Sequence, residues 1–128
     1  MHEADPRHAR GEAGEEIALR FLATRGYRLV ARRLRAGRRE LDLVVERGRL
    51  LVAVEVKWRR SAEAAGAAGA AEAWRPAQRA RAAEAVLLAM EAFGDRPWRF
   101  DLVTIEERPD GLTLTHRPGA WSPGGSFW

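Results

Sequence analysis

The 128-residue chain has no cysteine, a single lysine and no apolar run that approaches the roughly 20 residues of a membrane span. Without cysteine it has no disulfide framework, no thiolate metal site and no cysteine nucleophile. The opening sequence MHEADPRHARGE lacks the apolar segment of a signal peptide. The Gly-rich phosphate loop, the HExxH helix and the G-x-S-x-G elbow are also missing, which leaves the NTPase, zincin and serine-hydrolase classes without support. These absences predict a soluble cytoplasmic protein with no membrane partner.

Arginine supplies nearly all of the positive charge. The net charge is +4, and Lys57 is the only lysine among the 22 basic residues. Because a guanidinium group binds phosphate through two parallel hydrogen bonds, this composition indicates a nucleic-acid partner. The codon bias of a GC-rich genome would produce the same enrichment. In either case, a chain that uses arginine everywhere else has kept a compact amine at position 57, which points to a specific role for Lys57.

Hydrophobic periodicity predicts one α/β domain over residues 11–121, with a flexible, charged lead-in at 1–10 and a loose tail at 122–128. The low-complexity segment 61–73 is predicted to be a mobile loop, with a weak alanine helix as the alternative. The predicted elements are a helix at 11–25, strands at 27–34, 40–46 and 50–58, a helix at 76–93, and strands at 98–106 and 112–117. Gly26 and Gly94 are expected to end the two helices.

The stretch RRELDLVVERGRLLVAVEVKWRR is predicted to form a hairpin with polar residues on one face. Alternate residues of a strand lie on the same face, so Glu40 and Asp42 share a face of the first strand, and Glu55 and Lys57 share a face of the second. A two-residue turn at 47–48 or at 48–49 brings the two faces together, whereas a one-residue slip separates them. The hairpin therefore predicts three carboxylates and one ammonium group on a single patch.

Two interpretations of this patch follow from the residues. Buried like charges are costly unless a cation joins them, so the functional interpretation is a divalent metal held by Asp42 and Glu55, with Lys57 beside it. The alternative is a solvated face, which many antiparallel sheets have. Leu51 and Ala53 on the same face argue against full solvation. The residues alone leave these two interpretations about equal.

Two acidic residues outside the hairpin are candidates for the same site. A helical projection places Glu15 on the flank of the apolar stripe and Glu16 nearly opposite, so Glu15 is the glutamate of this helix expected to reach an interior site. The alternative role for Glu15 is to complement the helix dipole. Asp101 interrupts an apolar strand, where it either serves the site from a distance or pairs with an arginine. Pairing is the favoured interpretation.

The predicted second helix becomes polar toward its N-terminus. Arg75 and Arg79 continue its apolar stripe, and Gln78 lies on the edge of that stripe. Arginines on the inward side of a helix N-terminus would form a phosphate site. An equally weighted alternative is that these side chains extend into solvent.

The pattern Asp42 … Glu55-Val56-Lys57 resembles the metal site of the PD-(D/E)xK nuclease superfamily. The flanking residues narrow the resemblance to the bacterial YraN-like family, which is similar to archaeal Holliday-junction resolvases. The matching motifs are Gly11 … Gly14-Glu15 … Ala18, Gly26-Tyr27, Glu40-Leu41-Asp42-Leu43-Val44, Val54-Glu55-Val56-Lys57 with Arg59, Arg99-Phe100-Asp101-Leu102-Val103 and His116 … Ala120-Trp121.

This resemblance implies a restriction-endonuclease-like αβββαβ core with a mixed central sheet flanked by helices. It assigns metal coordination to Asp42, Glu55 and Glu15, and the catalytic lysine position to Lys57. The implied activity is Mg²⁺- or Mn²⁺-dependent hydrolysis of phosphodiester bonds in DNA rather than RNA, branched DNA included. A homodimer is implied because cleavage of a junction needs two sites. The residues expected to hold the nucleic-acid backbone are Arg38, Arg39, Arg59, Arg60, Arg75, Gln78 and Arg79.

Enzymatic activity stays uncertain at this level. A non-catalytic nucleic-acid-binding or protein-interaction module could keep the same fold. Arg39 stands where the family usually has glycine, and its guanidinium group could take a metal's place between Glu40 and Glu55. Such a module would bind DNA equally well without metal. An unrelated α/β domain, basic through codon bias alone, would have no DNA affinity at moderate salt.

Overall fold

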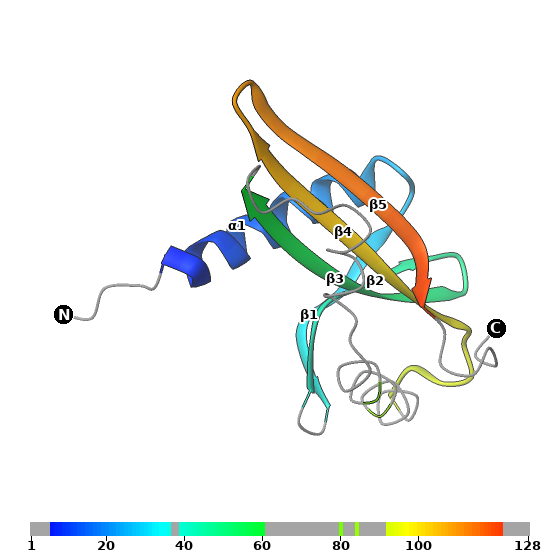
Figure 1. Ribbon diagram of the computed structural model, residues 1–128. Coiled ribbons are helices and arrows are strands. Elements are labelled where there is room, and N and C mark those ends of the chain that lie inside the picture. Colours follow the sequence, from blue (N-terminus) through cyan, green and yellow to red (C-terminus); the bar gives the residue numbers. More distant parts are fainter. Residues whose placement is uncertain (1–5, 37–38, 61–79, 81–83, 85–91, 122–128) are drawn as a thin grey trace.

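The computed structural model describes residues 6–36, 39–60, 80, 84 and 92–121, with side chains for 11–35, 41–60, 80, 84 and 92–120. Within these residues the chain forms one complete helix and a five-stranded mixed sheet (Figure 1). The elements are α1 (Pro6–Ala23), β1 (Arg28–Ala36), β2 (Arg39–Arg47), β3 (Leu50–Arg60), β4 (Trp98–Arg108) and β5 (Gly111–Trp121). The predicted α/β class is confirmed, and the arrangement is consistent with a restriction-endonuclease-like core.

The strands follow one another across the sheet in the order β1-β2-β3-β4-β5. Only the central pair, β3 and β4, is parallel, while the three other neighbouring pairs are antiparallel. A parallel pair needs a long crossover connection, and residues 61–97 supply it here. The parallel pairing of β3 and β4 therefore requires a long connecting segment between them, such as a second helix.

The predicted second helix at 76–93 lies mostly outside the described residues. Four of its positions are described, and Ala80, Glu84, Ala92 and Phe93 are all helical. Gly94 follows with a φ of 76°, a conformation that suits glycine at the end of a helix. The loop prediction for 61–73 and the tail prediction for 122–128 also fall outside the described residues.

The first helix begins earlier than predicted, at Pro6, so it takes in residues 6–10 of the predicted lead-in. Proline is favourable in a first helical turn because its missing N–H would have no partner there, and this signal was overlooked. The predicted stop at Gly26 is confirmed, with a φ of 88°. The amides of Gly26 and Tyr27 donate to the carbonyls of Ala23 and Leu22, which closes the helix with a Schellman motif.

The strand predictions are correct in type and too short at their C-terminal ends. The β2–β3 turn falls at Gly48-Arg49, because Arg47 pairs with Leu50 in the register. This is the second of the two turn positions considered, and it keeps the predicted faces together. The largest error is in β5, which continues to Trp121, beyond the predicted strand end at 117. A register irregularity between Phe100 and Leu102 of β4 accommodates the extra residues of β5.

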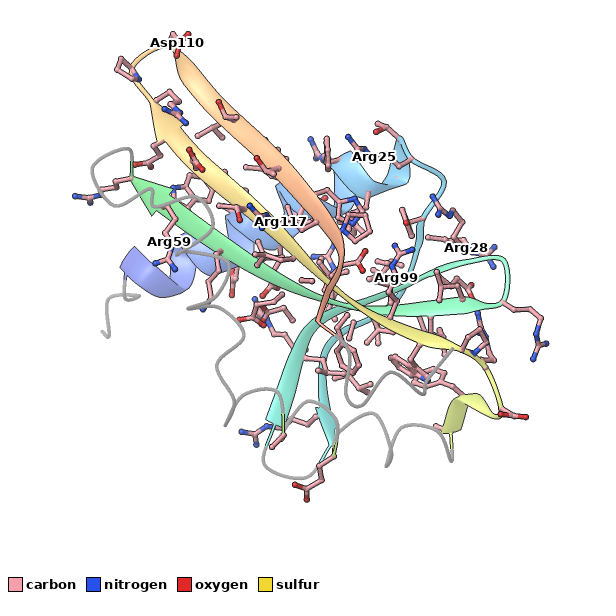
Figure 2. The ribbon with its side chains drawn as sticks, turned by 45° about the vertical axis from the view of Figure 1, so that its right-hand side comes forward. Arg25, Arg28, Arg59, Arg99, Asp110 and Arg117 are labelled. Atoms are coloured by element: carbon pink, nitrogen blue, oxygen red, sulfur yellow. The ribbon has the colours of Figure 1, made fainter. Side chains whose placement is uncertain are left out.

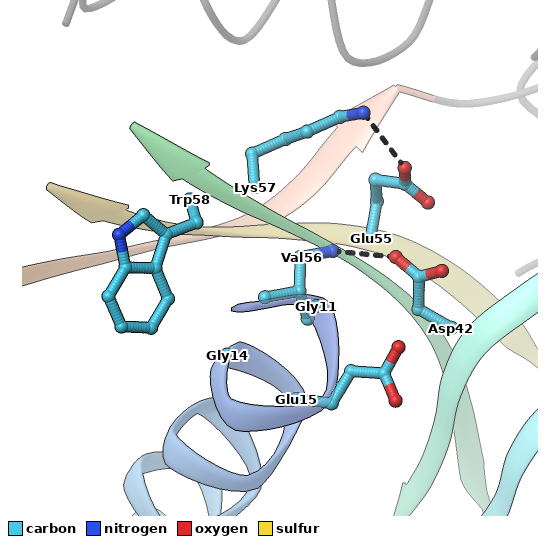
Figure 3. A pocket seen from close by; sticks show the side chains of 8 residues that line it. All are labelled: Gly11, Gly14, Glu15, Asp42, Glu55, Val56, Lys57 and Trp58. Atoms are coloured by element: carbon cyan, nitrogen blue, oxygen red, sulfur yellow. Dashed lines mark hydrogen bonds and ion pairs between the residues drawn. The ribbon is translucent and has the colours of Figure 1, made fainter. Parts of the chain in front are cut away.

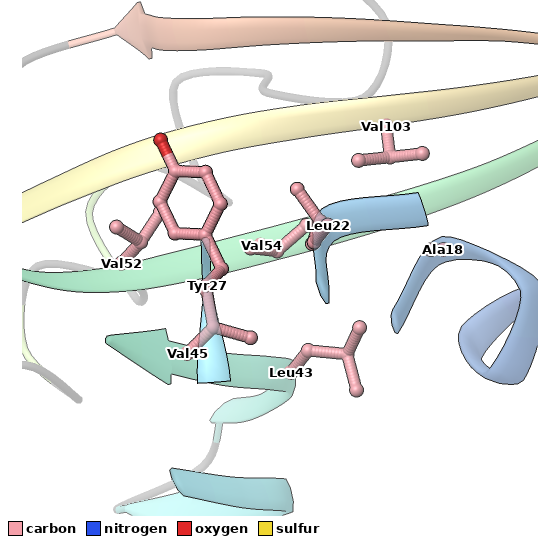
Figure 4. Packing of buried hydrophobic residues seen from close by; sticks show 8 residues of the cluster. All are labelled: Ala18, Leu22, Tyr27, Leu43, Val45, Val52, Val54 and Val103. Atoms are coloured by element: carbon pink, nitrogen blue, oxygen red, sulfur yellow. The ribbon is translucent and has the colours of Figure 1, made fainter. Parts of the chain in front are cut away.

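The sheet is buried on both faces at its centre. Leu43 and Val54 face α1, where they pack with Leu22 and other residues shown in Figure 4. Val44 and Ala53, the neighbouring register pair, lie in a second cluster on the opposite face. This double coverage explains why all five residues 51–55 of β3 are buried, and it makes the polar residue Glu55 exceptional within that run.

Candidate functional site

A pocket of about 210 Å³ opens beside β3, where α1, β2 and β3 meet (Figure 3). The helix α1 contributes one wall, β2 contributes a single carboxylate, and four consecutive residues of β3 form the floor. The lining residues are Gly11, Gly14, Glu15, Asp42, Glu55, Val56, Lys57 and Trp58. The pocket therefore brings together the four residues that the sequence assigned to catalysis.

The position of Asp42 follows from where β2 and β3 part. The ladder between these strands runs from the pair Arg47–Leu50 to the pair Leu43–Val54. Beyond it, the amide of Val56 donates a 3.1 Å hydrogen bond to Oδ2 of Asp42. Where the ladder ends, the Asp42 carboxylate thus accepts a hydrogen bond that a backbone carbonyl of β2 would accept in a continuing ladder. This hydrogen bond fixes the orientation of the carboxylate at the mouth of the separating strands.

Glu55 and Lys57 project from the same face of β3, as residues two apart on a strand must. The Nζ atom of Lys57 lies 3.4 Å from Oε1 of Glu55. The Glu55 side chain is only 8% exposed, whereas that of Lys57 is 32% exposed. The ammonium group therefore compensates a nearly buried carboxylate while remaining in reach of solvent and ligands.

The third carboxylate comes from α1. Glu15 lines the pocket, and its Oε1 lies 3.4 Å from Nε of Arg33 on β1. The attraction of Glu15, followed by that of Glu12, raises the pKa of the Arg33 guanidinium. Glu16 points the other way, where a hydrogen bond from Arg32 lowers the pKa of its carboxyl group. The helix thus presents Glu15 to the pocket and Glu16 to the surface.

The donors in the pocket fit a divalent metal in kind. Three carboxylates offer the hard oxygen atoms that Mg²⁺ and Mn²⁺ prefer. Across the described ranges, however, no three histidine, aspartate or glutamate side chains are placed closely enough together to hold an ion. Two of the pocket carboxylates, Glu15 and Glu55, have a cationic partner instead. The structure therefore has the right donor chemistry in one pocket without a formed three-carboxylate cage.

The structure describes only some of the residues predicted to hold the nucleic-acid backbone. Arg59 and Arg60 end β3, directly after the pocket residues. Arg39 begins β2, but its side chain and that of Glu40 are not described. The other predicted contacts, Arg38, Arg75, Gln78 and Arg79, lie outside the described residues. The backbone-binding set therefore stays a prediction.

Two pocket features were not found by sequence reasoning. Trp58 forms an aromatic wall against α1, which approaches so closely that a Cβ atom on Gly14 would lie 3.3 Å from Cε3 of Trp58. The second feature is Arg33, which forms an ion pair with Glu15 and has a left-handed backbone conformation with a φ of 49°. The Gly14-Glu15 motif carried a signal for the first feature, since glycine inside a helix often marks a close approach. No local signal separates Arg33 from the other arginines of β1.

Asp101 lies outside the pocket and is fully buried. It pairs with an arginine, as favoured from the sequence, and it also joins two residues of β5. Its carboxylate oxygens contact Arg99 Nε and Nη2 (both 2.8 Å), His116 Nε2 (2.7 Å) and the amide of Gly119 (3.0 Å). Arg99 in turn donates to Oη of Tyr27 at 2.6 Å. The network fastens β4 and β5 to Tyr27, which lies in the connection between α1 and β1.

Comparison with known proteins places the chain in a family. The sequence profile described as "Uncharacterised protein family UPF0102" matches residues 14–105, which include Glu15, Asp42, Glu55 and Lys57. The chain belongs to family UPF0102. This membership confirms the family that the sequence motifs indicated.

Relatives in UPF0102 come from several bacterial groups. A UPF0102 protein of Bordetella avium is 43% identical over 102 residues, which cover 80% of this chain and 70% of the relative. One from Symbiobacterium thermophilum is 43% identical over 103 residues, covering 79% and 85% of the two chains. Among solved structures, that of Pyrococcus furiosus SfsA in complex with Ca²⁺ aligns with 16% identity and a TM-score of 0.33, covering 88% of this chain and 63% of that chain. A TM-score this low does not assign a fold.

No helix in the described part of this UPF0102 protein is long and apolar enough to cross a membrane.

Proposed function

We propose that this chain is a metal-dependent endonuclease that hydrolyses phosphodiester bonds in DNA, branched DNA included. The observation that carries the proposal is the convergence of Glu15, Asp42, Glu55 and Lys57 on one pocket, although three separate elements supply them. Carboxylates beside a lone lysine, at the point where β2 and β3 separate in a basic protein, suit the cleavage of an anionic backbone.

Asp42 and Glu55, supported by Glu15, would hold Mg²⁺ or Mn²⁺. When bound, such an ion lowers the pKa of a coordinated water and neutralises charge on the phosphoryl oxygens. Because the three carboxylates do not form a cage as they stand, coordination by all of them requires rotation of the glutamate side chains, whose several torsions allow it. The Val56 amide keeps the Asp42 carboxylate in place meanwhile.

Lys57 has two roles in this proposal. Its ammonium group neutralises Glu55 in the resting site, at 3.4 Å. During cleavage it orients the attacking water or stabilises negative charge that develops on the phosphate. Arg59 and Arg60, together with Arg38, Arg39, Arg75, Gln78 and Arg79, hold the backbone of the substrate, so binding is sensitive to salt and largely independent of base sequence.

A non-catalytic nucleic-acid-binding module is the second candidate. The observation in its favour is that Glu15 and Glu55 already have cationic partners, which gives two of the pocket carboxylates a counter-charge without a metal. Such a module binds DNA with the same affinity in EDTA as in Mg²⁺.

The decisive experiment is a cleavage assay on nicked, linear and four-way-junction DNA with Mg²⁺, Mn²⁺ or EDTA. We expect a metal-dependent product that Asp42→Ala and Lys57→Ala each reduce by at least about 100-fold. Asp95→Ala, which changes an exposed carboxylate outside the pocket, serves as the matched control. A wild-type protein that is inert on every substrate, yet binds DNA in EDTA, would replace the nuclease with the binding module.

A further inference from the structure

Three exposed arginines have no carboxylate partner among the described residues. They are Arg25, which follows α1, and Arg47 and Arg49, which lie on either side of the glycine in the β2–β3 turn. By contrast, Arg32 pairs with Glu16 at 2.7 Å. A guanidinium group without a counter-charge keeps its full attraction for an external anion, because no ion pair has to break before that anion binds.

Neutral groups hold these three side chains in place. The guanidinium carbon of Arg25 lies 4.4 Å from the ring centre of Phe21. That of Arg47 lies 4.4 Å from the ring centre of Tyr27, and Arg47 also donates to the carbonyl of Arg25 at 3.4 Å. Arg49 donates to a backbone carbonyl in the connection before β4 at 3.0 Å. Because a guanidinium group stacked on a ring still directs N–H groups outward in its plane, these arginines are ordered and remain available to a phosphate.

Two further arginines adjoin this group and share one carboxylate. Nη2 of Arg28 lies 2.8 Å from Oε2 of Glu46, and Nη2 of Arg96 lies 3.0 Å from Oε1 of the same glutamate. Nε of Arg96 donates to the carbonyl of Arg49 at 2.9 Å, which joins the two groups. The five arginines together form the basic corner. The carboxylates beside them are those of Glu46 and the exposed Asp95, so the corner has an excess of positive charge.

The basic corner lies at the other end of α1 from the pocket. The pocket includes Glu15, in the first half of the helix, whereas Arg25 follows the helix C-terminus. At about 1.5 Å of rise per residue, Glu15 and Ala23 are about 12 Å apart along the helix axis. In Figure 2, Arg25 and Arg28 lie on the right, and Arg59, which follows the pocket residues of β3, lies on the left. None of the five arginines lines the pocket.

We propose that the basic corner binds the phosphate backbone of a nucleic acid outside the pocket. Arg25 and Arg47 contact phosphates through their outward N–H groups, while Arg28 and Arg49 add positive charge around them, so binding needs neither a metal ion nor a particular base sequence. A DNA duplex has one negative charge per about 1.7 Å of its axis, whereas an extended acidic peptide has one per about 3.4 Å. A dense group of arginines therefore favours nucleic acid over an acidic protein. The inference rests on the proposed function only for the class of polymer.

Binding of a short fluorescent DNA duplex in EDTA tests the corner without cleavage. Arg25→Gln combined with Arg47→Gln removes two charges from the corner, whereas Arg20→Gln combined with Arg32→Gln removes two that Glu16 compensates. We expect the corner variant to bind at least about tenfold more weakly, with a salt dependence of log K less steep by about 2, and the control to lose less than about threefold. Thermal unfolding verifies that both variants are folded. Equal losses, or no loss in the corner variant, would overturn the proposal.

Removal of a carboxylate gives the converse test and keeps every arginine. Glu46→Gln frees Arg28 and Arg96 from their shared counter-charge, and Glu16→Gln does the same for the two arginines that share Glu16. We expect Glu46→Gln to tighten DNA binding at least about threefold and Glu16→Gln to change it by less than about twofold. Equal tightening by both, or none by Glu46→Gln, would show that the corner is not the binding surface.

A polyglutamate peptide with the same number of charges identifies the polymer. We expect it to bind at least about tenfold more weakly than DNA. Polyglutamate binding as tight as that of DNA, and lost in the corner variant, would assign the corner to an acidic protein instead. Comparison with the cleavage assay separates this inference from the proposed function. Cleavage by a wild-type protein whose corner variant binds DNA normally would refute the corner alone, whereas corner-dependent binding by a protein inert in cleavage would refute the nuclease alone.

Discussion

Arg33 and Glu15 form an ion pair that joins the wall of the pocket to the outer strand of the sheet, with 3.4 Å between Nε and Oε1. Among the described residues, Arg33 is the only non-glycine residue with a positive φ. Such a backbone conformation is unfavourable for a residue with a Cβ atom, and it persists only where the surroundings hold it. The strained position aims the guanidinium group at Glu15, and secondarily at Glu12.

Replacing Arg33 with glycine should separate stability from activity. Glycine adopts the positive φ without strain, so we expect Arg33→Gly to unfold thermally at the wild-type temperature or slightly above it. Glu15 loses a positioning cation, so metal-dependent cleavage should fall about tenfold or more. Thermal unfolding and the cleavage rate, measured on the same preparation, give both answers.

The neighbouring arginine provides the control. Arg32→Ala removes an ion pair with Glu16, which points away from the pocket, so its cleavage rate should match that of the wild type. If Arg32→Ala and Arg33→Gly slow cleavage equally, general loss of basic charge would explain the effect, and Arg33 would have no positioning role.

Lys57→Arg tests whether the single lysine is required as an amine. The substitution keeps the positive charge beside Glu55 and so should leave thermal stability near that of the wild type. A guanidinium group is larger, planar and cannot replace a compact ammonium at a reacting phosphate, so we expect cleavage to fall by about 100-fold. Full activity of this variant would show that position 57 needs only a charge.

Two glycines of α1 should respond oppositely to alanine. A Cβ atom at Gly11 would meet nothing within 4 Å, so Gly11→Ala should raise the free energy of unfolding by about 0.5–1 kcal/mol. A Cβ atom at Gly14 would lie 3.3 Å from Trp58 and 3.6 Å from both Val56 and Ile105. We expect Gly14→Ala to lower it by about 1 kcal/mol through overpacking, as measured by denaturant unfolding. Stabilisation by both would mean that α1 can move away from the sheet.

The buried Asp101 network should make stability sensitive to acid. Burial opposes ionisation of Asp101, but hydrogen bonds from His116, Arg99 and Gly119 together hold its pKa below the ordinary value. Because the folded-state pKa is the lower one, the contribution to stability is complete above the unfolded value of about 3.9 and is lost as the pH falls through the folded value.

Asp101→Asn measures this contribution. At pH 7 we expect the free energy of unfolding to drop by about 3 kcal/mol, since Arg99 loses its buried partner. The difference from the wild type should shrink once the pH falls below about 3.9. Asp95→Asn, at an exposed position, should show neither effect. A difference that stays constant down to strongly acidic pH would contradict the assigned pKa direction.

Local patterns were enough to predict most elements and the shared face of the hairpin. The alternation around Asp42 and Glu55 predicted which side chains lie together, and the position of the turn, at Gly48-Arg49, belonged to the class that preserves it. The pairing of Asp101 with an arginine was likewise the favoured interpretation of an acidic residue that interrupts an apolar strand. The errors occur at the ends of elements: α1 begins at Pro6, which a local proline signal favours, and β5 extends to Trp121 through pairing with Phe100 of β4.

The element types, the α/β class, the family and the four charged residues of the pocket could thus be predicted from the chain alone, because periodicity, glycine positions and ordered motifs are properties of the chain. The partners that compensate the charges of these residues follow from the folded arrangement. The Asp42 carboxylate meets the Val56 amide because β2 and β3 part there, Arg33 reaches Glu15 across two elements, and β5 is left at the edge. These relationships join residues distant in sequence through packing and register, which no local pattern records.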